Sequence, residues 1–197
     1  MGNLEHDVGV VLVERVPHRR GGRGAATVRY TLNKDHTDVV FEISHVGFSN
    51  KHGWFRDISG SLELDADKPE NSTVTVTINA VSIDTNHAKR DQDLTGATFL
   101  DTAKFPQMTF VSTGVTRTGA ETPDITGLLT LHGMTKPLVL HARLNRMAPN
   151  PFDHTPTAGF TARGALKRSD YGMTTFIPVI GDEVSIVIDA EFSGAKP

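Results

Sequence analysis

The chain has 197 residues, of which 38% are hydrophobic and 22% charged, and its net charge of −3 is dispersed along the sequence. This composition predicts one soluble globular domain without a transmembrane segment, since no apolar run approaches the length of about 18 residues that a spanning helix needs. The dispersed charge and the 7% of aromatic residues argue against nucleic-acid binding, and the absence of cysteine removes disulfides, thiolate catalysis and cysteine-ligated zinc.

The first residues do not have the pattern of a secretory signal. Glu5 and Asp7 are acidic where a signal has a basic region, and the apolar run from Val8 to Val13 is short. We therefore expect a cytoplasmic protein. Residues 18–24 are basic and rich in glycine, so residues 1–26 are predicted to form a flexible arm before a domain at 27–194.

From Thr27 onward, apolar and polar residues alternate with the period of two that is typical of half-buried β-strands. The pattern recurs in eight or nine runs, which favours an all-β sandwich or a closed barrel, and the alternation does not choose between them. The apolar positions predicted to face a common interior are Val39, Phe41, Ile43, Ile58, Leu62, Val76, Ile78, Phe110, Leu129, Leu140, Phe160 and Ile186.

One stretch, around residues 84–105, breaks this alternation. Asp84, Thr85 or Asn86 is predicted to cap a short helix at 87–94, which Gly96 would end. Phe99, Leu100 and Phe105 follow without a period of two, so they are predicted to lie as a plug across an opening.

Several short motifs occur along the chain at a specific spacing. They are Asp35-His36-Thr37, His45-Val46-Gly47, Gly53-Trp54-Phe55, residues 82–85, Arg90-Asp91, Lys104-Phe105-Pro106, Met108-Thr109-Phe110, residues 127–137, residues 168–173 and residues 181–184. Taken together, these segments resemble the YceI-like family of lipocalin-like, polyisoprenoid-binding proteins. Thr37, Leu100 and Tyr171 depart from the usual residues, which bears on ligand size. The resemblance covers Tyr30 to Gly194 and implies an extended eight-stranded antiparallel barrel with a hydrophobic interior. It also weakens the cytoplasmic prediction, because many similar proteins are exported to the periplasm.

Polar residues near the expected barrel ends permit several interpretations. The nine histidines include no H-E-x-x-H motif, so we predict no metal, and we expect His36 and His45 to be buried and hydrogen-bonded at a barrel end. Arg90 and Asp91 are predicted to clamp the helical insertion to the rim, because a guanidinium can bridge several acceptors. The alternative is that Arg90, with Arg168 or Lys136, contacts the polar head of an amphiphile. Asp170 completes the predicted polar set.

The leading hypothesis is that the barrel stores, transports or sequesters a long-chain isoprenoid, an isoprenoid quinone or a similar amphiphilic lipid, without a cofactor and without catalysis. The polyisoprenoid identity is what the family resemblance implies. Two alternatives remain: an enzyme acting on a lipophilic substrate at the mouth, and a stress or partner-binding protein whose barrel is packed shut. The absence of a G-x-S-x-G motif weakens the first alternative. The oligomeric state is left open, with a homodimer as one option.

Overall fold

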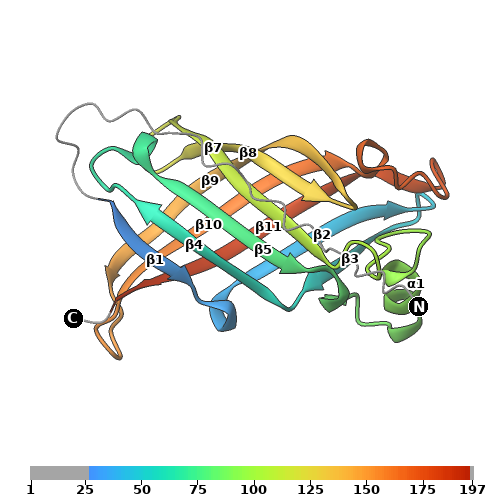
Figure 1. Ribbon diagram of the computed structural model, residues 1–197, viewed down its shortest axis with the longest axis horizontal. Coiled ribbons are helices and arrows are strands. Elements are labelled where there is room, and N and C mark those ends of the chain that lie inside the picture. Colours follow the sequence, from blue (N-terminus) through green and yellow to red (C-terminus); the bar gives the residue numbers. More distant parts are fainter. Residues whose placement is uncertain (1–26, 196–197) are drawn as a thin grey trace, which may run out of the picture.

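The computed structural model describes residues 27–195 of the chain (Figure 1), so the arm predicted at 1–26 lies outside the described residues. Its strands are β1 (Val28–Leu32), β2 (Asp38–His45), β3 (Ser49–Phe55), β4 (Ile58–Leu64), β5 (Thr73–Asn79), β6 (Ile83–Asp84), β7 (Gln107–Arg117), β8 (Pro123–Leu131), β9 (Met134–Pro149), β10 (Pro156–Lys167) and β11 (Ile180–Gly194). The helices are α1 (Ala88–Thr95) and the 3-10 turns η1 (Lys34–His36), η2 (Pro69–Asn71), η3 (Ala80–Ser82) and η4 (Arg168–Tyr171).

The strands close into an antiparallel barrel. The order runs β1-β4-β5-β7-β8-β9-β10-β11, and β11 pairs back with β1. The long strand β11 pairs with β1 near its end, where Leu32 faces Phe192, and with β2 before that, where Val39 faces Ile188. In the same way, β4 pairs with β1 and β3 pairs with β2, so β3 and β4 together occupy one strand position of the barrel. The barrel therefore has eight strand positions, which confirms the predicted fold.

The alternation of side chains creates the barrel interior. In β5, Val74, Val76 and Ile78 point to the inside, and threonines occupy the positions between them. β-Branched residues suit the pleated surface of a sheet, and successive side chains point to opposite faces. Apolar rows from all sides of the barrel meet in three adjoining clusters of buried residues. One apolar face thus lines the inside of the whole barrel.

The predicted insertion lies between β6 and β7, and it contains α1. Its N-cap is His87, whose Nδ1 accepts a hydrogen bond from the Arg90 amide at 3.2 Å, so the prediction of a cap at residues 84–86 is wrong. Histidine can replace the usual oxygen acceptor here because its unprotonated ring nitrogen also accepts. Gly96 ends the helix as predicted. Within residues 27–195, no helix is both long and apolar enough to span a membrane.

The β8–β9 hairpin turns at His132 and Gly133, which have φ angles of 51° and 71°. Two successive positive φ angles are typical of the tight turn that matches the twist of a hairpin. At Gly133 an added Cβ would also lie 2.5 Å from the Phe105 ring, so glycine is required there for space as well as for conformation. This turn brings the end of the insertion against the barrel.

Candidate functional site: an apolar barrel cavity with a charged mouth

A cavity of about 490 Å³ occupies the interior of the barrel. Ligand pockets commonly have volumes of about 300–1,000 Å³. All twelve apolar residues that the alternation predicted to face the interior lie on the wall of this cavity. The wall continues through Leu32, Phe55, Met108, Leu131 and Phe192, which the prediction did not include. The cavity is thus lined by apolar side chains over most of its surface.

Phe41 shows how the wall is packed. Its ring lies 5.7 Å from the ring of Phe55, measured between centroids. On the neighbouring strand its register partner is Gly53, where an added Cβ would come within 2.3 Å of the Phe41 ring. The missing side chain at Gly53 gives the ring space to lie against the β3 backbone, so the aromatic wall does not fill the cavity.

We call one end of the barrel the mouth. Figure 1 shows α1, the β2–β3 turn and the loop before β11 gathered at this end. Phe99 and Leu100 from the insertion lie on the cavity wall here, and the Phe99 ring is 6.3 Å from the Phe176 ring of the loop before β11. Phe105 instead packs edge-on against His132, with ring centroids 4.8 Å apart. Two of the three predicted plug residues therefore face the cavity.

The charged residues on the cavity wall are Lys51, Arg90, Asp93 and Arg168. They come from β3, α1 and η4, which meet at the mouth. Asp93 lies 3.7 Å from Lys89, and Lys51 forms no ion pair with any residue in the described range 27–195. On the cavity wall at the mouth, three cations therefore outnumber one acid, although the whole chain carries a net charge of −3.

Arg168 is buried at the mouth, with 5% of its surface exposed. Its guanidinium donates to the backbone carbonyls of Gly181 at 2.7 Å, Met173 at 2.8 Å and Ile180 at 3.0 Å. Burial lowers the pKa of Arg168 from its usual value, and the negative charge of Asp182 opposes this shift. The guanidinium thus fixes the loop between η4 and β11, which forms part of the rim.

Arg90 and Asp91 hold α1 through one residue, Thr85, which is buried. The Arg90 guanidinium donates from Nε to the Thr85 hydroxyl at 2.8 Å and from a terminal nitrogen to the Thr85 carbonyl at 2.7 Å. The Asp91 carboxylate accepts from both the amide and the hydroxyl of Thr85. These contacts favour the clamp interpretation, although Arg90 also lies on the cavity wall.

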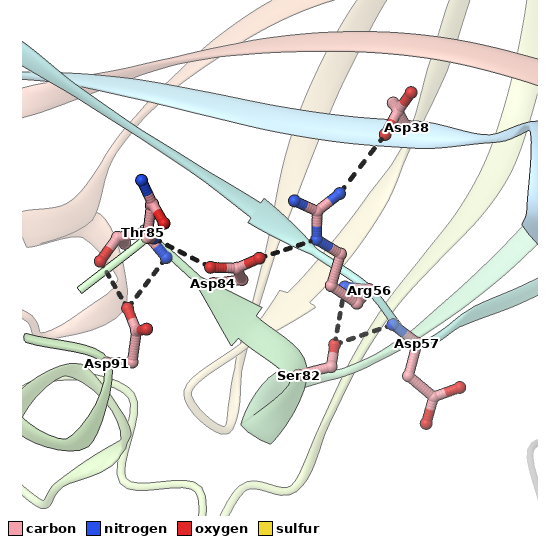
Figure 2. A network of polar contacts seen from close by, with 8 residues as sticks. Asp38, Arg56, Asp57, Ser82, Asp84, Thr85 and Asp91 are labelled. Atoms are coloured by element: carbon pink, nitrogen blue, oxygen red, sulfur yellow. Dashed lines mark hydrogen bonds and ion pairs between the residues drawn. The ribbon is translucent and has the colours of Figure 1, made fainter. Parts of the chain in front are cut away.

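A second arginine, Arg56, extends this attachment to the barrel (Figure 2). Its Nε donates to the Asp84 carboxylate at 3.0 Å, and its NH1 lies 3.8 Å from Asp38 on β2. The backbone amides of Arg56 and Asp57 both donate to the Ser82 hydroxyl. A polar chain therefore runs from β2 through Arg56 to Asp84, whose carboxylate also accepts from the Asn86 amide at 2.9 Å, and Asp84 directly precedes Thr85 in the chain. Arg56 is not predictable from the sequence, because a single arginine between strands has no distinctive pattern.

Three residues of the predicted polar set are exposed to solvent: His36, His45 and Asp170. His36 and His45 are exposed, so the prediction that they are buried and hydrogen-bonded is wrong; His45 lies at the cavity mouth and His36 does not. His45 is the last residue of β2, and His36 ends the turn η1 before the other end of this strand, so both side chains lie where the chain meets solvent. Asp170 is exposed on η4 and lies off the cavity wall. The carboxylate near Arg168 is Asp182, which accepts from the amide and hydroxyl of Ser169 at 2.9 and 2.8 Å.

Lys51 is the main cavity residue that the sequence analysis missed. The signal was present, because Lys51 alternates with Gly53 and Phe55 and therefore shares their inward face. A lysine and a glycine on that face obscured the apolar pattern. Within residues 27–195, no group of three or more histidines and acids is placed to hold a metal ion.

The comparisons with known proteins agree with this geometry. The family described as "YceI-like domain" matches residues 30–192. "Protein YceI" of Salmonella arizonae and that of Salmonella paratyphi B are each 43% identical to this chain over 169 residues, which is 85% of this chain and 87% of theirs.

Solved structures show the same fold. The YceI protein of Campylobacter jejuni is 32% identical, with a TM-score of 0.69 over 85% of this chain and 98% of its own. BcnA of Burkholderia cenocepacia has a TM-score of 0.74 at 21% identity, over 81% and 98% of the two chains. A polyisoprenoid-binding domain from Saccharophagus degradans has a TM-score of 0.65 at 15% identity, over 85% and 99%. The chain belongs to the YceI-like family.

Proposed function

We propose that this protein binds a long-chain isoprenoid or a similar amphiphilic lipid inside its barrel, and so stores, transports or sequesters it. The observation that carries the proposal is the apolar cavity of about 490 Å³, whose charged residues all come from the mouth. An amphiphile has the same division between an apolar chain and a polar head. The printed name of the domain from Saccharophagus degradans, a polyisoprenoid-binding domain, supports this ligand class.

Burial of the chain supplies the main driving force. Each isoprene unit moved from water into the cavity contributes about 4 kcal/mol gross, at about 0.8 kcal/mol per carbon group. The loss of chain flexibility offsets much of this gain. A ligand of several isoprene units therefore has enough apolar surface for stable binding, whereas a single unit does not.

The positive balance of the mouth indicates which way the ligand lies. Lys51 has no ion-pair partner among residues 27–195, and the guanidinium groups of Arg90 and Arg168 donate to uncharged oxygens of hydroxyl and backbone carbonyl groups. A polar or anionic head near these cations would gain charge-assisted hydrogen bonds. We therefore place the head at the mouth and the chain in the cavity.

The cavity also bears on the alternatives. A barrel packed shut would have no space of this size, so the closed-barrel alternative has no structural support. For an enzyme, the Ser169 hydroxyl bonded to Asp182 is a turn contact without a histidine base among its hydrogen bonds. The histidine–carboxylate pairs His141–Asp124 and His52–Glu42 lie off the cavity wall. Binding without turnover is the simpler account of this mouth.

The test compares two substitutions at Phe41. Phe41→Glu places an unpaired carboxylate in the cavity at a cost of several kcal/mol, and should abolish the lipid that copurifies with the protein. Phe41→Leu keeps the wall apolar at a cost of roughly 1 kcal/mol and should retain it. The measurement is mass spectrometry of an organic extract of each purified protein, with circular dichroism to establish folding.

Two results would count against the proposal. A folded Phe41→Glu protein that keeps lipid at the wild-type ratio would place the ligand outside the barrel. Conversion of the extracted lipid into a new product during incubation with fresh protein would support the enzyme alternative instead.

A further inference from the structure

A second, smaller cavity of about 110 Å³ lies at the end of the barrel opposite the mouth. It is lined by residues of the β4–β5 and β7–β8 connections, including Pro69 and Gly119, and by Leu144 of β9. Figure 1 shows these connections at the end away from α1. Most of its lining is apolar, as in the main cavity.

Four residues line both cavities: Leu62, Val74, Ile125 and Phe160. Leu62 and Val74 are register partners on β4 and β5, Ile125 lies on β8 and Phe160 on β10. We call these four residues the partition. The backbone runs around the barrel wall, so only side chains separate the two spaces. A change of side chain can therefore join them without any change of fold.

Phe160 has the largest side chain of the partition and a special backbone position. The register between β9 and β10 shifts between Gly159 and Phe160, as in a β-bulge, and a bulge redirects the side chain beside it. The Phe160 ring packs edge-to-face on Phe192, with centroids 6.1 Å apart. Phe192 lines only the main cavity, and Leu144, the register partner of Phe160, lines only the second one. The ring thus stands between the two spaces.

We propose that Phe160 sets the length of the apolar chain that the barrel accepts. This inference rests on the proposed function and adds a specificity-determining residue to it. The end of the chain stops at the partition, and the second cavity stays unused while the Phe160 ring is in place. Removal of the ring joins the second cavity to the first, so the barrel accepts a longer chain.

The experiment measures how the delipidated full-length protein binds farnesol, geranylgeraniol and geranylfarnesol, which share a hydroxyl head and increase in chain length by one isoprene unit each. Native mass spectrometry gives the affinity of each alcohol. Phe160→Ala should raise the affinity ratio of geranylfarnesol to geranylgeraniol by at least about tenfold, since each extra apolar group placed in a fitting pocket is worth about tenfold or more. Phe160→Leu, which removes less volume, should shift the ratio in the same direction by less.

Phe41→Ala is the matched control. It removes the same ring from the main cavity, away from the partition, so it should lower affinity without favouring the longer alcohol. If the wild type binds the alcohols and neither Phe160 variant changes the ratio, the inference is wrong and the proposed function stands. An equal ratio change in Phe41→Ala would also overturn it, because cavity volume alone would then explain the effect. If the wild type binds none of the alcohols and carries no copurified lipid, the proposed function itself fails.

Discussion

Two arginines at the mouth, Arg90 and Arg168, donate from their guanidinium groups to uncharged oxygens: Arg168 to three backbone carbonyls, and Arg90 to the hydroxyl and the carbonyl of Thr85. Neither forms an ion pair within 4 Å with a described residue. Such contacts fix the loops that carry the carbonyls, while the positive charge remains available to a third group. A structural role and a role in holding a head group are therefore compatible in one residue. Substitutions that keep the charge but change the shape separate the two roles.

Arg90→Lys is the sharpest of these substitutions. Lysine keeps the positive charge but loses the planar fork, so at least one of the two hydrogen bonds to Thr85 is lost. We expect the free energy of unfolding to fall by about 1–2 kcal/mol, measured by chemical denaturation, with copurified lipid retained. A head-group role predicts the reverse, namely unchanged stability and weaker lipid binding.

Lys89→Ala provides the neighbouring control. Lys89 is exposed and lies 3.7 Å from Asp93, so its loss should change the unfolding free energy by less than about 1 kcal/mol. A loss of stability as large as that of Arg90→Lys would indicate that the helix, and not the Thr85 contact, responds to any change in charge.

At the scale of elements, the segment from η4 to β11 is held by two kinds of contact. Arg168 binds three carbonyls, and Asp182 accepts two hydrogen bonds from Ser169. The Ser169 amide, followed by its hydroxyl, lowers the pKa of Asp182 below its model-compound value of 3.8, while partial burial opposes the shift. A carboxyl whose pKa is lower in the folded state stabilises the fold above its unfolded-state pKa. This contribution disappears as the pH falls through the folded-state value.

Asp182→Asn should therefore be destabilising at neutral pH, because asparagine carries no charge and offers one acceptor oxygen instead of two. The difference in unfolding free energy from wild type should begin to shrink as the pH falls below about 4, where the unfolded-state carboxyl of the wild type takes up a proton, and should reach its minimum once the pH has passed the lower folded-state pKa. Urea denaturation across this pH range measures it. Asp170→Asn is the control, since Asp170 is exposed and makes none of these hydrogen bonds. A difference for Asp182→Asn that stays constant down to the lowest pH would show that shape, not charge, matters at this turn.

The elements also show where sequence reasoning succeeded and where it could not. Alternation with a period of two indicates which side chains of a strand face the interior, and all twelve residues predicted to face inward lie on the cavity wall. Lys51 follows the same alternation. It is recognised as an inward residue only if the pattern is extended across Lys51 itself and Gly53, neither of which is a large apolar residue. The exposure of His36 and His45, and the network around Arg56, depend on where strands end and which ends meet. These features depend on the tertiary structure, which the alternation of apolar and polar residues does not encode.

At the scale of the whole molecule, the closure of the barrel through β1 and β11 leaves, among the described residues, a free edge along β3, which pairs with β6 only at Trp54 and Phe55. It also leaves an apolar interior that is not filled. The alternation alone left sandwich and barrel undecided, because both need one apolar face per strand. Closure follows from the pairing of β1 with β11, which joins the first and last strands of the described chain. An unfilled interior lacks part of the packing that a solid core provides. A ligand that fills it should therefore stabilise the whole fold.

This coupling leads to a prediction for thermal unfolding. Adding geranylgeraniol to delipidated protein, at a free concentration about 100-fold above its dissociation constant, should stabilise the folded state by about 2.7 kcal/mol. For a domain of this size, about 1 kcal/mol shifts Tm by roughly 2–4 °C, so the expected rise is roughly 5–10 °C by differential scanning calorimetry. Prenol has the same head group and a single isoprene unit, so at the same concentration it should change Tm by much less. Arg90→Lys should keep the rise from its lower starting Tm, and folded Phe41→Glu should lose it. A full rise in Phe41→Glu would mean that the alcohol binds outside the cavity, and the lipid-binding role of the interior would then be wrong.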